Sequence, residues 1–266
     1  MFGMSLFGET ISSSFMALMM TTRGCDPFFV YATRLFWYHA RSFQKGVMQH
    51  VLLQKNGCEH LTVFFAGWGM DKNPFLDFRV SESDLLICFN YTDLDFNSCL
   101  LEGYKRVRVV AWSLGVWAVS SLMDDFPVLA ENAIAVNGTP FPVDETRGIP
   151  PNVFQGTLEG LSNASLARFD RRMCGDAATL AAYTRVHPKR SVESLVEELA
   201  WIGRESTMRK VSPPFKRAIV GKRDAIFSCD NQENAWRGLC PVDVIDAAHY
   251  SHELLRSVIC GGGEYG

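Results

Sequence analysis

The chain has 266 residues, of which 47% are hydrophobic and 21% are charged, and it carries a formal net charge of -3. This composition is typical of one globular domain with a substantial core, and the lack of a basic excess argues against a nucleic-acid partner. No uncharged apolar run approaches the roughly 18 residues that a membrane span needs, which argues against a membrane partner, and scattered cysteines without a C-x-x-C pair are typical of a reduced cytoplasm.

The first 47 residues differ from the rest of the chain. They are rich in Met, Phe and Ser and carry few charges. A secretory signal peptide is a poor match, because no basic residue precedes the apolar stretch 15–20. We therefore predict that residues 1–47 are an extension outside the fold, with Met48 as a possible true translation start. The alternative is an N-terminal helical extension.

From Met48 onward, strand and helix patterns alternate. Residues 49–55 alternate like a strand, and Asn56-Gly57 predicts a hairpin turn. Apolar runs that end in turn residues predict further strands, with helical patterns between them. We expect strands at 61–66, 84–90, 107–112, 132–136, 215–220 and 241–247, and helices ending near 104 and spanning 114–123, 230–237 and 251–259. This alternation predicts an α/β fold with a mainly parallel central sheet and helices on both faces.

Residues 141–212 interrupt this alternation. Prolines open a loop-rich stretch, and three helical patterns follow without a convincing strand, at 157–173, 176–186 and 191–205. An all-helical insertion between the strands of an α/β sheet is the usual construction of a lid. We therefore predict an α/β domain over residues 48–266 with a helical lid at about 141–212.

The stretch from Val107 to Trp117 predicts a strand, an abrupt turn and a helix, with Ser113 on the turn. Ala111 and Gly115 flank this serine, which makes the stretch a close variant of the G-x-S-x-G nucleophile elbow. Such a turn lifts the serine oxygen above the sheet edge and places it at a helix N-terminus, where unpaired N–H groups favour negative charge. We therefore predict that Ser113 is a nucleophile.

Two further groups, Asp224 and His249, follow directly after predicted strands. Because the carboxyl ends of strands form the active-site edge of an open α/β sheet, both can meet Ser113 there. The order Ser, Asp, His resembles that of the α/β-hydrolase family, in which the histidine takes the serine proton and the acid orients the ring. The rivals left open are Asp230 and Asp246 for the acid and His252 for the base, whereas His39, His50, His60 and His187 have no acidic partner at a suggestive place.

An oxyanion intermediate needs two hydrogen-bond donors. One is expected from the backbone N–H of Leu114, the residue after the nucleophile, and the other from the loop after an early strand. Gly67-Trp68-Gly69 is that loop, and we predict the Trp68 N–H as the donor. The alternative is a plain turn with the indole packed in the core. We expect no metal and no cofactor at this site.

Four stretches carry a family resemblance: Phe64-Phe65-Ala66-Gly67-Trp68-Gly69-Met70-Asp71, Ala111-Trp112-Ser113-Leu114-Gly115-Val116-Trp117, Asn137-Gly138-Thr139-Pro140 and Arg168-Phe169-Asp170-Arg171-Arg172-Met173-Cys174-Gly175. Together they resemble the BioG-type esterases of biotin synthesis from about Met48 to Ile259, and residues 1–47 have no counterpart. The glycine loop and the elbow also resemble the BioH-type enzymes. The resemblance implies an α/β-hydrolase fold with Ser113, Asp224 and His249 as a catalytic triad.

The activity that the resemblance implies is hydrolysis of the methyl ester of pimeloyl-[acyl-carrier protein], which yields methanol. The carrier is acidic and its phosphopantetheine arm brings a phosphate, so basic residues are expected at the mouth of the lid. The candidates are Arg168, Arg171 and Arg172, with Lys189 and Arg190 behind them; the alternative is a solvated face partly neutralised by Asp170. The apolar lid residues Phe154, Leu158, Leu161 and Leu166 either line an acyl tunnel or form the lid core.

We therefore expect a cytoplasmic, monomeric serine carboxylesterase whose partner is an acyl-carrier protein. Two alternatives stay open. One is a different hydrolase on the same machinery, such as a thioesterase or a small-ester carboxylesterase. The other is a non-catalytic protein that binds acyl-carrier proteins.

Overall fold

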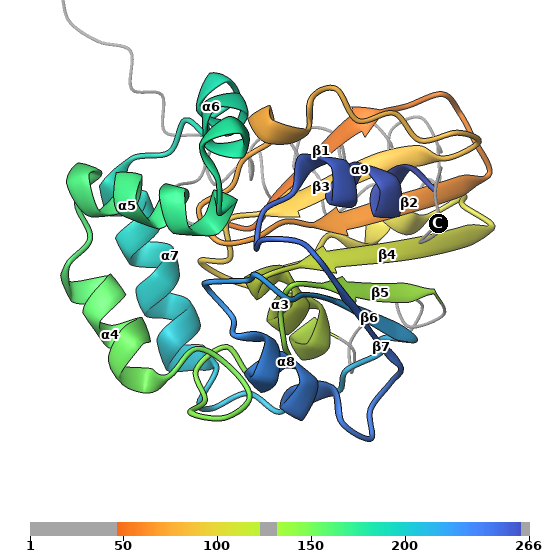
Figure 1. Ribbon diagram of the computed structural model, residues 1–266. Coiled ribbons are helices and arrows are strands. Elements are labelled where there is room, and N and C mark those ends of the chain that lie inside the picture. The colour runs from red at the N-terminus through yellow and green to blue at the C-terminus, as the bar shows by residue number, and fades with distance from the viewer. Residues whose placement is uncertain (1–46, 123–131, 262–266) are drawn as a thin grey trace, which may run out of the picture. The chain divides into compact units, whose positions relative to one another are not determined.

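The structure is a computed structural model that describes residues 47–122 and 132–261 (Figure 1). These residues all fall within one of the two units into which the chain divides, Gln44–Gly266. The extension predicted over residues 1–47 lies, apart from residue 47, outside the described residues.

Within the described residues, seven strands form one sheet in the order β1-β3-β2-β4-β5-β6-β7. β1 runs antiparallel to β3, and every other neighbouring pair is parallel. The predicted mainly parallel α/β sheet is confirmed. The strands are β1 (Gln49–Gln54), β2 (His60–Phe65), β3 (Asp84–Phe89), β4 (Arg106–Trp112), β5 (Ala133–Val136), β6 (Arg217–Gly221) and β7 (Val242–Ile245).

The hairpin predicted at Asn56-Gly57 is wrong, because β1 pairs with β3 and not with β2. β2 is buried from its second residue onward and lies between β3 and β4, whereas the less buried β1 takes the edge. The turn is instead tied to the start of β3. There the Asp84 Oδ1 accepts the N–H groups of Asn56 at 2.7 Å and of Cys58 at 3.4 Å.

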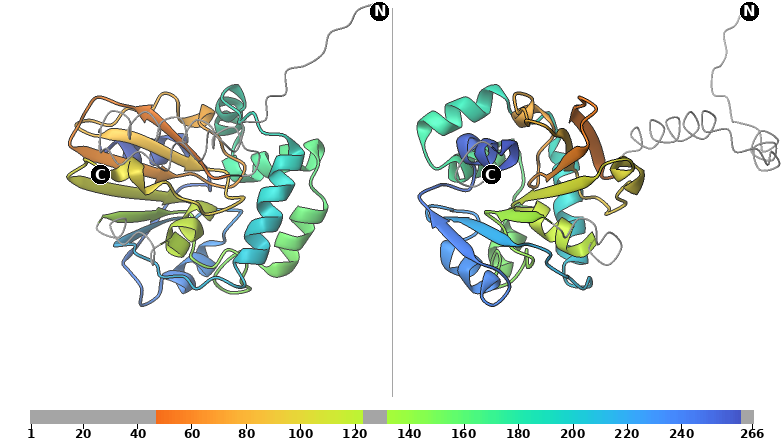
Figure 2. Two further views of the ribbon diagram at one scale, coloured as in Figure 1. Left: turned by 180° about the vertical axis from the view of Figure 1, so that it is seen from behind. Right: turned by 90° about the vertical axis from the view of Figure 1, so that its right-hand side faces the viewer.

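Helices cover both faces of the sheet. α3 (Leu114–Leu122) and α8 (Cys229–Trp236) bury Trp117 and Trp236 in one core cluster with Val63 of β2. α9 (His252–Cys260) buries Leu255 in a second cluster with Phe64, the next residue of β2. Figure 2 shows α3 and α9 on opposite sides of the sheet, as the alternating side chains of β2 require. The other short elements are two 3-10 turns, η1 (Asn73–Phe75) and η2 (Ser98–Leu101), the second in place of the helix expected to end near 104.

Four helices lie between β5 and β6 in the described sequence: α4 (Pro151–Glu159), α5 (Asn163–Cys174), α6 (Ala177–Arg185) and α7 (Val192–Glu205). Figure 1 shows them gathered at one end of the sheet, and we call them the lid helices. The single helix predicted over 157–173 is two helices. Ser162 and Ser165 form a capping box that starts α5 directly after Gly160 has ended α4.

The described cysteines are all free thiols. None of the helices in residues 47–122 and 132–261 has the length and apolar character that crossing a membrane demands.

Candidate active site

Ser113 stands on a strained turn between β4 and α3. Its φ of 58° lies in the left-handed region, which L-residues rarely adopt. The turn is crowded, because a Cβ on Gly115 would lie 2.4 Å from the carbonyl oxygen of Phe65. The predicted strand–turn–helix is therefore present, and the close contact with β2 requires a glycine at position 115, two residues after the serine.

Ser113, His249 and Asp224 are brought together in one hydrogen-bonded series. The His249 Nε2 lies 2.9 Å from the Ser113 Oγ, and the His249 Nδ1 lies 2.8 Å from the Asp224 Oδ2. All three side chains are buried. A neutral imidazole with its proton on Nδ1 fits both contacts, since it donates to the carboxylate and accepts from the serine hydroxyl.

The Asp224 carboxylate is held by groups that sequence reasoning did not identify. Its Oδ1 accepts the backbone N–H groups of Ile226 at 2.8 Å and Phe227 at 2.9 Å. Its Oδ2 accepts the buried side-chain amide of Gln232 on α8 at 3.1 Å. Because these bonds leave one carboxylate lone pair for His249, they fix the direction in which the acid meets the ring.

The backbone that carries His249 is held by two more residues. The indole N–H of Trp112, next to the serine, donates to the His249 carbonyl oxygen at 3.0 Å. The Asn137 side chain donates to the carbonyl oxygens of Ala248 and His249, each at 2.9 Å, and accepts the Gly221 N–H at 2.6 Å. Asn137 belongs to one of the stretches that resemble the BioG-type esterases, but no pattern in the sequence indicated this role.

The rival acid and base candidates lie elsewhere. Asp246 pairs with Arg223 at 2.5 Å, and Asp230 is exposed in the first turn of α8. His252 is the first residue of α9 and lies 3.2 Å from Asp77. Neither Asp246 nor His252 therefore contacts Ser113 or His249.

The Gly67-Trp68-Gly69 loop lies directly against the serine. A Cβ on Gly67 would be 3.1 Å from the Ser113 Cβ, so a larger residue there would have to displace neighbouring side chains by a few tenths of an ångström. Among the described residues, neither the Trp68 N–H nor the Leu114 N–H donates to another backbone or side-chain group. The Trp68 indole is buried and donates to the Leu195 carbonyl oxygen at 3.0 Å, so the predicted alternative of a packed indole also holds.

Ser113, Leu114 and His249 line a cavity of about 580 Å³ between the lid helices and the sheet. Most of the remaining lining is apolar or aromatic, and it includes Trp68 and Phe154. Of the predicted tunnel residues, Phe154 lines this cavity and Leu166 lines a neighbouring one, whereas Leu158 and Leu161 pack against the core. The lid-core alternative therefore holds for Leu158 and Leu161, and the acyl tunnel stays a prediction for Phe154 and Leu166.

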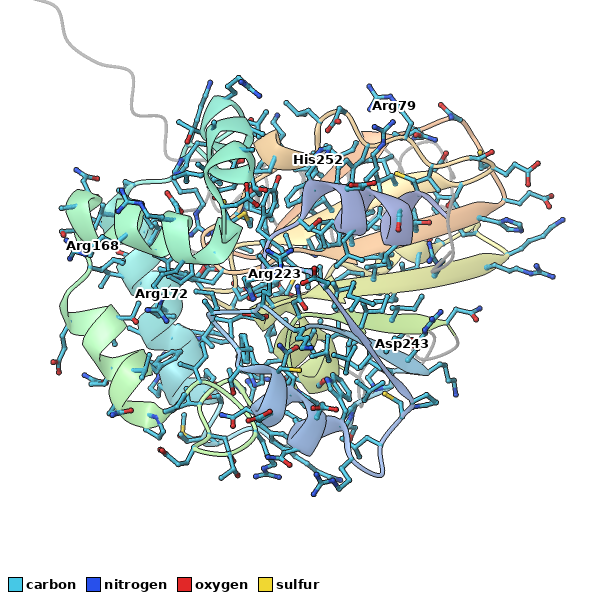
Figure 3. All side chains as sticks on the ribbon, viewed as in Figure 1. Arg79, Arg168, Arg172, Arg223, Asp243 and His252 are labelled. Atoms are coloured by element: carbon cyan, nitrogen blue, oxygen red, sulfur yellow. The ribbon has the colours of Figure 1, made fainter. Side chains whose placement is uncertain are left out.

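Among the predicted arginines, Arg172 alone lines the active-site cavity, and its guanidinium donates to the Ala225 carbonyl oxygen at 2.7 Å. Arg168 and Arg171 are exposed on the same helix, α5. Figure 3 shows Arg168 and Arg172 projecting from α5 on the lid side of the sheet. Arg190, placed behind them by the prediction, instead has a largely buried side chain that pairs with the fully buried Glu198 at 2.5 Å.

His187 has an acidic partner after all. Its Nε2 lies 3.0 Å from the Asp170 Oδ2, and its Nδ1 lies 2.9 Å from the Pro188 carbonyl oxygen. The hydrogen bond to Asp170, opposed by burial, raises the pKa of His187. Both residues line a second cavity of about 300 Å³. Within residues 47–122 and 132–261, the ion pair of Asp170 is with His187 and not with Arg168, Arg171 or Arg172. The sequence separation of 17 residues hid this pair.

The fold is that of the α/β hydrolases. The structure of a hydrolase from Pseudomonas aeruginosa shares it at a TM-score of 0.56 and 11% identity, covering 80% of this chain and 91% of its own.

A closer family also matches. The model of the family described as pimeloyl-ACP methyl esterase BioG matches residues 48–257. The crystal structure of BioG from Haemophilus influenzae covers 80% of this chain and 99% of its own, with a TM-score of 0.71 and 32% identity. This chain belongs to the BioG family.

A longer relative comes from Bacteroides fragilis. That protein is named malonyl-[acyl-carrier protein] O-methyltransferase, and it is 46% identical to this chain over 196 residues, which are 73% of this chain. This chain spans 40% of the length of that protein, so most of the relative lies outside the match.

Proposed function

We propose that this protein is a serine carboxylesterase that hydrolyses the methyl ester of pimeloyl-[acyl-carrier protein] in biotin synthesis. The observation that carries the proposal is the hydrogen-bonded series of Ser113, His249 and Asp224 in the wall of a largely apolar cavity. Membership of the BioG family supports the ester and the carrier-bound acyl group as the substrate.

The geometry suits an acyl-enzyme mechanism. Ser113 attacks the ester carbonyl carbon while the His249 Nε2 takes the hydroxyl proton, and Asp224 stabilises the resulting imidazolium. The N–H groups of Trp68 and Leu114 bind the oxyanion. Methanol then leaves with the proton from His249. A water molecule, deprotonated by the same ring, attacks the acyl-enzyme and releases the carboxylic acid.

The cavity suits the acyl chain of the proposed substrate. Its apolar lining receives a methylene chain without leaving polar groups unpaired. Arg172 in that lining, with Arg168 and Arg171 on the outer face of α5, offers positive charge to the phosphate and to the acidic carrier. The Bacteroides relative is named for O-methylation of a carrier-bound acyl group, which is the chemistry that supplies such an ester.

The test is a comparison of two substrates on the full chain. We expect kcat/KM for the methyl-pimeloyl carrier protein to exceed that for a short free methyl ester. Ser113→Ala should lower kcat on both substrates by at least about 10⁴-fold. The circular dichroism spectrum and melting temperature of this variant should match those of the wild type.

Two outcomes favour the alternatives. Equal kcat/KM on both substrates, without a gain from the carrier, would indicate a thioesterase or a small-ester carboxylesterase. Failure of the wild-type protein to react with a fluorophosphonate probe, together with tight carrier binding, would indicate a non-catalytic carrier-binding protein.

A further inference from the structure

A buried ion pair lies beside the Gly67-Trp68-Gly69 loop. Glu198 of α7 has no exposed side-chain surface, and its Oε2 lies 2.5 Å from the Nη1 of Arg190. A buried ion pair of this kind contributes little to stability compared with apolar residues of the same shape, because both charges lose their hydration. The pair therefore calls for a role other than stability.

Glu198 contacts the backbone that follows two neighbouring strands. Its Oε1 accepts the N–H of Tyr91, after β3, at 2.7 Å. Its Oε2 accepts the N–H of Gly69, after β2, at 3.4 Å. Arg190 adds a bond from its Nη2 to the Asn90 Oδ1 at 2.8 Å. One lid side chain thus holds both loops through charge-assisted hydrogen bonds.

The peptide units around the Trp68 N–H are also held. The Tyr91 hydroxyl donates to the Ala66 carbonyl oxygen at 2.7 Å, and the Met70 N–H donates to the Gly67 carbonyl oxygen at 3.3 Å. In a trans peptide the C=O and the N–H point in opposite directions, so the bond to Gly67 turns the Trp68 N–H away from this network. Glu198 holds the next peptide unit, between Trp68 and Gly69, through the Gly69 N–H. This arrangement leaves the Trp68 N–H available to bind a ligand oxygen.

We infer that Glu198, neutralised by Arg190, is a positioning residue that fixes the oxyanion-binding orientation of the Trp68 amide. The inference rests on the serine-hydrolase part of the proposed function and not on the identity of the acyl group. If Glu198 has this role, α7 both covers the cavity and helps to position an oxyanion donor. The effect acts on the transition state, in which the oxyanion forms, and not on binding of the ester.

The test uses Glu198→Gln in the full chain. Glutamine keeps the shape but has one acceptor oxygen, so it cannot accept from both Tyr91 and Gly69. We expect kcat on a short ester to fall about 10-fold or more with KM within about twofold, because loss of a whole oxyanion donor costs about 10²–10³-fold. The second-order rate constant for fluorophosphonate labelling of Ser113 should fall in parallel, and Glu198→Ala should lower both further.

Two control variants on α7 separate positioning from folding. Glu197→Gln changes the adjacent, exposed glutamate and should keep the wild-type kcat and labelling rate. Ile202→Ala creates a cavity one turn further along α7 and should lower the melting temperature while keeping kcat at temperatures well below it. If Glu198→Ala does not fold, the isosteric Glu198→Gln variant decides.

The inference is overturned if folded Glu198→Gln keeps the wild-type kcat and labelling rate, or if it loses no more activity than Ile202→Ala. Either result leaves the proposed esterase intact, because the wild type still hydrolyses the ester. A wild-type protein that neither hydrolyses the ester nor reacts with the probe would overturn the proposed function and this inference together.

Discussion

Asn137 joins the ends of three chain segments at the candidate site. It follows β5 with a φ of 44°, an uncommon conformation that asparagine tolerates better than most residues. Its amide bonds the backbone after β6, at Gly221, and the backbone after β7, at Ala248 and His249. One side chain thus sets the spacing between the strand that precedes Asp224 and the segment that carries His249.

We expect Asn137→Ala to lower the free energy of unfolding by about 2–4 kcal/mol, because it leaves several buried backbone groups without partners. It should also lower kcat about 10-fold, since the His249 carbonyl keeps only the Trp112 indole as a donor. Urea unfolding and steady-state kinetics measure the two effects. Asn234→Ala, at an exposed position on α8, should change stability by less than about 0.5 kcal/mol. Wild-type stability in Asn137→Ala would contradict this account of the residue.

For single residues, the sequence predicts a role when that role follows from the position of the residue next to a strand or turn. Ser113, Asp224 and His249 each follow a strand, and parallel strands end at one edge, so their meeting was predictable. Asn137 and Glu198 act through bonds to segments that are far away in the sequence, and nothing local to them indicates this. Gln232 bonds the nearby Asp224, but no motif marks it for this role. The left-handed φ of Ser113 was implied by the elbow motif, but that of Asn137 was not.

Among the elements, the lid helices depend on long-range polar contacts. α5 contributes Asp170 and the segment between α6 and α7 contributes His187, and their contact ties these elements together. Asp71 lies close enough to raise the pKa of His187 further, and the Pro188 carbonyl acts in the same direction. The imidazolium is therefore the form that this contact favours.

This contact should make lid stability depend on pH. Because the pKa of His187 is raised in the folded protein, its stabilisation is complete below the ordinary histidine pKa of about 6.5 and is lost as pH rises through the folded pKa. We expect His187→Gln to melt below the wild type at pH 5.5, by no more than about 3 °C since the ring is partly exposed, and level with it at pH 9. Asp170→Asn should remove the same pH dependence, and a difference that grows with pH would contradict the assignment.

The elements were predictable where pattern and burial agree. The apolar runs of β2, β3 and β4 and the helical patterns at 176–186 and 191–205 gave the right positions within a few residues. The division between α4 and α5 was missed, because the capping serines lie inside a continuous helical pattern. The hairpin prediction was wrong because Asn56-Gly57 indicates a turn but does not say which strand pairs with β1. That pairing is decided by how deeply each strand is buried in the whole sheet.

For the whole molecule, we propose residues 48–266 as the hydrolase domain, with α4–α7 as its lid. The match to the BioG family begins at residue 48, and β1 begins one residue later. The Met48 N–H already donates to the Asp93 Oδ1 at 2.9 Å. The predicted extension before it lies outside the described residues, so its role stays a prediction.

The net charge of -3 bears on how the proposed acidic carrier would approach the protein. Overall charge repels such a partner, so attraction has to come from a local patch. We expect Arg168→Glu combined with Arg171→Glu to raise KM for the carrier-bound ester about 10-fold and to leave the short ester unchanged. Added salt should reduce the difference, because it screens exposed charges. Arg106→Glu, at the amino end of β4, is the matched control. An equal effect from that control would contradict a local docking patch.

The contact between Glu198 and the Gly67-Trp68-Gly69 loop has a consequence for redesign of this protein. The lid helices, a single continuous insertion, contribute five apolar residues to the cavity beside Ser113, which invites exchange of that segment for one from a relative with other preferences: Val153, Phe154, Phe169, Met173 and Leu199. Such a graft would import the new cavity but would also sever the bond that α7 makes to Gly69. A working chimaera would therefore have to retain the glutamate and its arginine, even where the donor segment carries neither.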